Sequence, residues 1–185
     1  MLQSGKPCGF LKSNTVLENE MKVTLDIKIT AKDLFNFNIR QAYKGMQGFL
    51  SILLPVLLFA YGVNSIGKVD VIYTFVYFAL GVVFLVYVPF SLWKRANKVV
   101  NDPNNALSKT LHYEFREDAI RVEVEDQNVE FKWENIFMMK KSGKLLLVYT
   151  NRINAYILPL EQVGDKYTEL SELAKSKLEK YRLKL

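Results

Sequence analysis

Three lysines lie close together around one predicted turn of the chain. Lys140, Lys141 and Lys144 flank the pair Ser142-Gly143, and no carboxylate is nearer in sequence than Glu134. Cations at a hairpin tip can contact an anionic lipid headgroup, at about 1 kcal/mol per residue near a membrane surface, or a protein partner. An ordinary solvated turn has the same composition. The three lysines are therefore candidate contacts to a lipid or a partner.

Two further groups of residues could take part in acid–base chemistry. Glu117 and Asp118 are adjacent carboxylates, and His112 lies next to Tyr113. Neighbours on a strand point to opposite faces, and in a turn both face water, so we expect Glu117-Asp118 to be a solvated hairpin turn. His112 has no nucleophile placed with it in a motif, so we expect a surface histidine.

The remaining sequence excludes several other chemistries. One Cys and one His cannot form a zinc finger, a Cys-His nucleophile pair or an iron–sulfur cluster. No glycine-rich loop has the spacing that cradles phosphates. We therefore predict no catalytic residues, no cofactor and no metal, and hence a protein that is not an enzyme.

Two long apolar segments dominate the first half of the chain. Residues 45–67 and residues 71–93 each comprise 23 residues without a charged side chain. As helices each would be about 35 Å long, enough to cross a hydrocarbon core about 30 Å thick. The remaining residues could not wrap two helices that are apolar on every face. We predict a two-helix transmembrane hairpin spanning residues 45–93.

The charges beside these segments predict their orientation. Arg40 and Lys44 precede the first segment, Lys94, Arg95 and Lys98 follow the second, and the connection Lys68-Val69-Asp70 is neutral. Cytoplasmic flanks are enriched in Lys and Arg, so both termini should be cytosolic.

The net charge of +6 over 185 residues divides into +3 for residues 1–44, 0 for residues 45–93 and +3 for residues 94–185. A nucleic-acid-binding face would concentrate this charge. Nucleic acid is therefore not an expected partner.

The N-terminal region changes character at Met21. Residues 1–20 lack regular periodicity and are predicted to be a disordered tail, so Met21 is a possible natural start. From Val23 to Ile29 apolar and polar residues alternate, which indicates a half-buried strand. Thr30 and Asp33 resemble a capping box that opens a helix within residues 21–44. The strand has no nearby sheet, so its partner must lie in the C-terminal region.

The segment 97–185 is typical of short antiparallel strands followed by a helix. Alternating apolar residues predict strands at residues 111–115, 120–124, 129–133, 136–141, 145–149 and 155–158. Trp133 ends the third strand on the face of Val129 and Phe131, so it should anchor the core. After Asp165, a plausible N-cap, apolar residues three or four apart from Tyr167 to Tyr181 predict one helix. Its last turns would then hold the basic residues between Lys175 and Lys184.

These elements together predict the fold class. We expect an α+β membrane protein: a transmembrane hairpin with a cytosolic PH-like antiparallel barrel or sandwich, capped by a C-terminal helix. An acidic turn at Glu117-Asp118 disfavours inositide binding through that first hairpin.

Several segments resemble one protein family. The stretch from Leu111 to Ile120, then Trp133 with Ile136, then Tyr156-Ile157-Leu158-Pro159 is similar to the YcxB-like bacterial membrane proteins. The resemblance covers about residues 21–180. It implies an N-terminal strand and helix, a two-span hairpin and a PH-like domain, located in the bacterial cytoplasmic membrane.

The resemblance implies no settled activity, so two functions stay open. The first is a non-catalytic, membrane-tethered interaction module that recruits or senses a cytosolic protein partner. The alternative is a sensor of anionic lipid headgroups at the cytosolic membrane face, acting through Lys140, Lys141 and Lys144. The lipid bilayer is an expected partner in both cases, and a homo-oligomer is possible.

Overall fold

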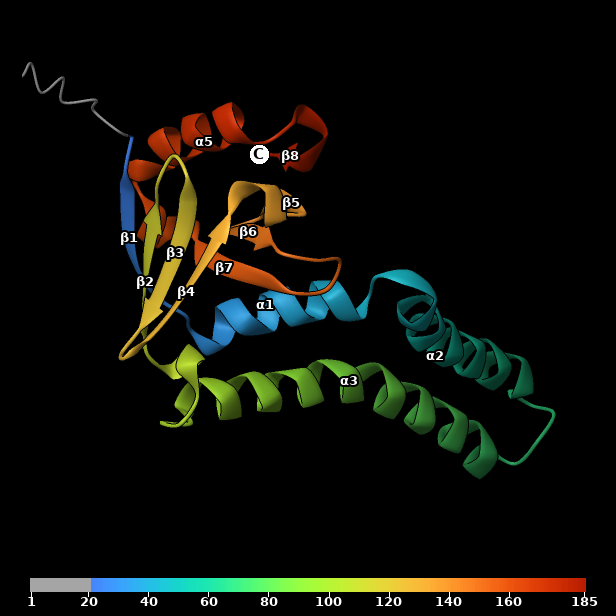
Figure 1. The fold of residues 1–185 in the computed structure, drawn as a ribbon. Coiled ribbons are helices and arrows are strands. Elements are labelled where there is room, and N and C mark those ends of the chain that lie inside the picture. Colours follow the sequence, from blue (N-terminus) through green and yellow to red (C-terminus); the bar gives the residue numbers. More distant parts are fainter. Residues whose placement is uncertain (1–20) are drawn as a thin grey trace, which may run out of the picture.

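The computed structural model describes residues 21–185 (Figure 1). The tail expected at residues 1–20 lies outside the described residues. The elements follow in the order β1 (Val23–Lys28), α1 (Ala31–Ala42), α2 (Gly45–Ser65), α3 (Val71–Asn101), η1 (Ala106–Ser108), β2 (Thr110–Phe115), β3 (Ala119–Val124), β4 (Gln127–Lys132), η2 (Trp133–Asn135), β5 (Met138–Ser142), β6 (Leu145–Tyr149), β7 (Ala155–Pro159), α4 (Leu160–Val163), α5 (Lys166–Lys177), η3 (Lys180–Arg182) and β8 (Leu183–Lys184).

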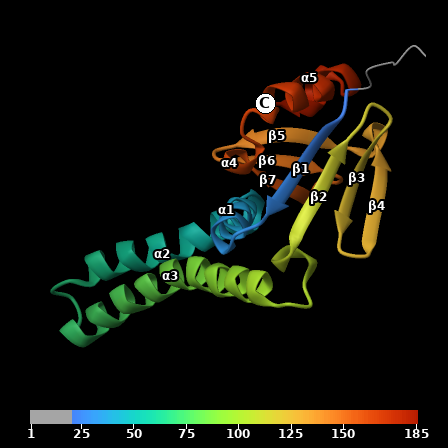
Figure 2. The same ribbon diagram turned by 90° about the vertical axis from the view of Figure 1, so that its left-hand side faces the viewer.

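The strands form two four-stranded sheets. Sheet A is antiparallel with the order β1-β2-β3-β4, and sheet B has the order β7-β6-β5-β8, with β8 parallel to β5. Helix α5 lies across one end of the two sheets (Figure 2). The core contains side chains of both sheets and of α5, among them Phe115, Ile120, Leu158 and Leu170, each 1% exposed or less. The predicted α+β class is confirmed.

Strand β1 joins a sheet made by residues far along the chain. Val23, Leu25 and Ile27 are buried while their neighbours face solvent. The strand pairs antiparallel with β2 over six positions, from Val23 opposite Phe115 to Lys28 opposite Thr110. The prediction that β1 pairs with the C-terminal region is confirmed. Helices α1, α2 and α3 therefore form an insertion between two paired strands.

Helix α1 begins at the predicted capping box. The Thr30 side chain accepts from the Asp33 backbone N–H at 3.2 Å, and the Asp33 carboxylate accepts from the Thr30 backbone N–H at 3.1 Å. The helix lies between β7 and α3 (Figure 2). Phe35 packs edge-on against Trp93 of α3, with ring centroids 5.4 Å apart. This packing joins the sheets to the long helices.

Helices α2 and α3 form an antiparallel pair that extends away from the sheets (Figure 1). Both are long and apolar enough to cross a membrane. Gly81 of α3 lies under the Phe59 ring, where an added Cβ would approach ring carbons to 3.0 Å. Their outer side chains are exposed, including Leu57 at 55% and Phe75 at 69%. Apolar surface of this extent is costly in water and stable in hydrocarbon.

Two helices differ from the sequence predictions. Helix α3 continues to Asn101, through the boundary expected between residues 93 and 97. Helix α5 ends at Lys177, and Tyr181 is 68% exposed in η3, so the prediction of one helix reaching Tyr181 is wrong. Leu178 leaves the helix with an extended backbone and is itself buried, which redirects the chain toward β8. Asp165 occupies the N-cap of α5 but its side chain makes no capping hydrogen bond.

Candidate interaction groove

An apolar groove opens where the two sheets meet α1. Its volume is about 560 Å³, within the range of ligand sites in proteins, about 300–1,000 Å³. Its walls come from four parts of the fold: Phe37 of α1, Leu107 of η1, Val122 and Val129 of sheet A, and Tyr156 of β7. We call this site the interaction groove.

The groove exists because β4 is an uncovered edge strand. Val129 pairs with Val122 of β3 and so shares its inner face. Val122 is 5% exposed, whereas Val129 is 54% exposed. The predicted strand face of Val129, Phe131 and Trp133 is therefore buried at Trp133 but open at Val129. The sandwich does not close over β4, and its apolar inner face is accessible from outside.

Two tyrosines, Tyr113 and Tyr156, line the groove. Tyr156 of β7 stacks on Phe131 of β4, with centroids 5.4 Å apart and planes 4° from parallel. Its other neighbour is Tyr113 of β2, at 5.9 Å and nearly perpendicular. Burial raises the pKa of both tyrosines, and for Tyr113 the neighbouring Tyr156 phenol contributes as well. Both hydroxyls are consequently neutral at physiological pH.

The Tyr113 hydroxyl is buried at the wall of the groove without a hydrogen-bond partner among residues 21–185. A buried hydroxyl without a partner costs about 1–3 kcal/mol. A bound molecule with a polar group at this depth could supply the missing hydrogen bond.

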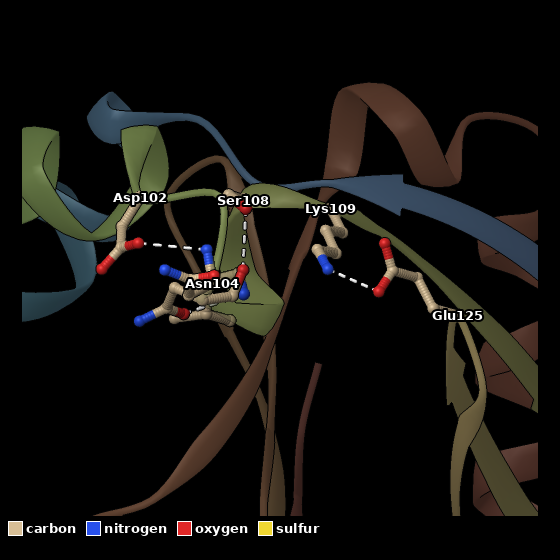
Figure 3. Close-up of polar contacts among 7 residues, drawn as sticks. Asp102, Asn104, Ser108, Lys109 and Glu125 are labelled. Carbon is tan, nitrogen blue, oxygen red and sulfur yellow. Dashed lines mark hydrogen bonds and ion pairs between the residues drawn. The ribbon is translucent and has the colours of Figure 1, made fainter.

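Polar contacts in the connection between α3 and β2 position one wall of the groove. The Asp102 carboxylate accepts from the Asn104 backbone N–H at 3.0 Å, and the Ser108 hydroxyl donates to the Asn105 carbonyl at 2.7 Å (Figure 3). Lys109 pairs with Glu125 of the β3–β4 turn at 2.5 Å (Figure 3). These contacts hold Leu107 of η1 against the groove.

The groove wall is uncharged. No Asp, Glu, Lys or Arg is among the described residues that line it. Its polar side chains besides the tyrosines are four amides, Asn38, Gln41, Gln127 and Asn154. Gln41 donates to the Ile153 carbonyl at 3.2 Å. Amides and apolar side chains suit an uncharged ligand that has its own amide groups.

None of the three candidate lysines lines the groove, and two of them do not share a face of sheet B. Lys140 and Lys141 are neighbours on β5, so their side chains leave opposite faces of sheet B. The Lys141 ammonium lies 5.1 Å from the centre of the Tyr167 ring of α5. Ser142 lies between Lys141 and Lys144 in the sequence, and its hydroxyl accepts a hydrogen bond from the Arg40 guanidinium of α1 at 2.6 Å. A contact of these lysines with lipid or a partner stays a prediction.

The candidate acid–base residues also lie elsewhere. Glu117, in the β2–β3 turn, accepts from Lys177 at 3.2 Å, and this hydrogen bond lowers the pKa of its carboxyl. His112 pairs with Asp26 at 2.5 Å on the exposed outer face of sheet A. The structure brings neither into the groove. Among residues 21–185, no cluster of three or more His, Cys, Asp or Glu side chains could hold a metal ion.

Sequence reasoning missed the groove, although one signal was present. The residues expected to close the core at β4 alternate with polar ones, and Gln127 occupies an inner-face position next to Val129. An amide at an inward position is unusual for a packed core. It indicated that this corner is open to water.

Comparison with known proteins adds one finding to this geometry. No curated protein and no solved structure matches the chain. A family model described as YcxB-like protein matches residues 115–174, which run from the end of β2 into α5 and include β4 and β7 of the groove. The match confirms the resemblance seen in the sequence: the chain carries the YcxB-like segment at residues 115–174.

Proposed function

We propose that this protein is a non-catalytic interaction module, tethered to the bacterial cytoplasmic membrane, that recruits or senses a protein partner on the cytosolic side. The observation that carries the proposal is the uncharged, solvent-accessible interaction groove. It is built by the sheets together with α1 and η1, the elements that connect directly to α2 and α3. A partner held there would be held at the membrane surface.

The domain that offers the groove is PH-like in this proposal. Strands β1 to β4 form one sheet, β5 to β7 belong to the second, and α5 covers one end. The hairpin of α2 and α3 is inserted after the first strand. Its insertion anchors the domain through two chain connections, which restrains how the groove can face the membrane.

The pairing of β1 with β2 supports a prediction about topology. β1 precedes both apolar helices and β2 follows them, so the chain must cross the bilayer an even number of times for the strands to meet. The Lys and Arg residues beside the helices favour a cytosolic location for both ends. A fluorescent reporter at Leu185 should be active, and an alkaline phosphatase fusion at the same position inactive. Phosphatase activity at Leu185 would contradict this orientation.

Site-specific photo-crosslinking in native membranes tests the proposed recruitment. Benzoylphenylalanine at Val129 places the reactive ketone in the groove, and the same residue at Tyr181 provides a control that is even more exposed, at 68%, and does not line the groove. We expect a discrete protein adduct from position 129 and none from position 181. Equal labelling at both positions, or adducts with lipid alone at position 129, would refute recruitment through the groove.

A lysine variant separates the two candidate functions in the same assay. Changing Lys140, Lys141 and Lys144 to Glu leaves every residue of the groove in place. Recruitment through the groove predicts an unchanged adduct at position 129. Loss of the protein adduct would move the partner's contact to the β5–β6 turn, and a lipid adduct that the lysine variant loses would favour the lipid-sensing alternative.

A further inference from the structure

We propose that the partner binds as an extended strand, added antiparallel to the free edge of β4, with uncharged apolar side chains entering the interaction groove. This inference rests on the proposed recruitment of a protein and names how the partner is recognised. It starts from the sheet order, in which β4 is terminal and pairs only with β3 among the described strands. Such an edge presents unpaired N–H and C=O groups to another chain.

The β3–β4 hairpin determines which backbone groups are free. Val124 and Gln127 pair across the two-residue turn Glu125-Asp126, where Glu125 has a φ of 50°. A turn of this kind closes with a hydrogen-bonded pair, and the pairs then alternate along the ladder. The N–H groups of Asn128, Glu130 and Lys132 consequently point to the free edge.

The two faces of β4 specify different partner chemistry. Val129 and Phe131 share the inner face of sheet A, and Val129 lines the groove, whose described lining residues carry no charge. Glu130 and Lys132 face outward and are exposed. The Glu130 carboxylate lies 3.6 Å from the Arg116 guanidinium, and the Glu130 side chain is 52% exposed. A partner strand should therefore place apolar residues opposite Val129 and Phe131, a cation opposite Glu130 and a carboxylate opposite Lys132.

Amide and apolar groups in the groove favour a peptide over a lipid chain. A peptide strand carries backbone amides that the free edge of β4 and the side chains of Gln127 and Asn154 can bind. A hydrocarbon chain would leave those donors and acceptors, and the Tyr113 hydroxyl, without partners. The charge pattern of Glu130 and Lys132 also has no counterpart in a hydrocarbon chain.

Two synthetic peptides of identical composition test the inference on the full chain in phospholipid nanodiscs. Acetylated Thr-Glu-Val-Lys-Val-Thr amide places Lys opposite Glu130 and Glu opposite Lys132, whereas Thr-Lys-Val-Glu-Val-Thr amide places like charges opposite each other. We expect the first peptide to bind roughly tenfold more tightly, because two cross-strand pairs change from attraction to repulsion. The double variant Glu130→Lys, Lys132→Glu should reverse this preference.

A variant that removes one backbone N–H of β4 provides an independent test of strand addition. Asn128→Pro removes one outward N–H without breaking the ladder to β3, a position where an edge strand tolerates proline. Asn128→Ala keeps that donor and is the matched control. The proline variant should weaken both peptides several-fold and the alanine variant should not. If the proline variant melts early, the reversal by the charge-exchanged variant still decides the question.

Three outcomes overturn strand addition. The first is that neither peptide binds at millimolar concentration, which would mean that the charges of β4 only protect its edge. The second is that the preference fails to reverse in the charge-exchanged variant. The third is that native mass spectrometry finds a lipid in the groove that neither peptide displaces. A photo-adduct at Val129 that persists in the Asn128→Pro and charge-exchanged variants would leave recruitment standing and refute the strand mode alone.

Discussion

Deleting Met21–Ile29, which removes β1, should abolish the protease resistance of residues 97–185. Val23, Leu25, Ile27 and Ile29 are each 4% exposed or less. Each such side chain contributes roughly 1.5–3 kcal/mol when buried. The four together match the whole stability of a typical domain, about 5–15 kcal/mol. Limited proteolysis of the full chain in native membranes, followed by immunoblotting for the C-terminus, measures the loss.

The outer face of the same strand provides the control. Thr24, Asp26 and Lys28 are exposed, and Asp26 contacts His112 in a pair exposed on both sides. Exposed ion pairs contribute about 0–1 kcal/mol. The triple change of these residues to Ala should leave digestion close to that of the parent. A deletion variant that digests like the parent would mean that β1 does not support this domain.

Trp133→Ala should destabilise the domain by about 3–5 kcal/mol, the usual cost of removing a buried large aromatic side chain. Trp133 is 4% exposed and lies in η2, directly after β4. Its Nε1–H donates to the Arg116 carbonyl at 2.8 Å, and its ring is 6.3 Å from that of Phe115. The substitution therefore removes both packing and a partly buried hydrogen bond. Denaturant unfolding of the full chain in detergent measures the change. It is monitored by far-ultraviolet circular dichroism, because the substitution removes a tryptophan and would alter the fluorescence signal.

Trp133→Phe separates the two contributions. Phenylalanine keeps an aromatic ring in the core but leaves the Arg116 carbonyl without its donor. An unsatisfied buried acceptor costs about 1–3 kcal/mol, so this variant should fall between the parent and Trp133→Ala. An alanine variant with the midpoint of the parent would show that Trp133 is not an anchor of the core.

Local patterns in the sequence determined much of this architecture. The alternation from Val23 to Ile29, the Thr30–Asp33 capping box and the two uncharged segments each depend on residues within one element, and each is present in the structure. Trp133 also lies in the core as predicted. The reason is that side-chain periodicity and capping are local properties of the backbone, which one short segment is sufficient to specify.

The interaction groove was decided by the tertiary structure alone. An alternating strand shows which face is apolar but not what covers that face. The sequence pattern therefore puts Val129, Phe131 and Trp133 on one apolar face, although β4 is an open edge. The nearness of Lys140, Lys141 and Lys144 in sequence likewise suggested one cluster. Neighbours on a strand leave opposite faces, and Lys141 packs on Tyr167 of a helix more than twenty residues further along the chain. The groove forms where β4, β7, α1 and η1 meet, and only long-range packing brings those four segments together.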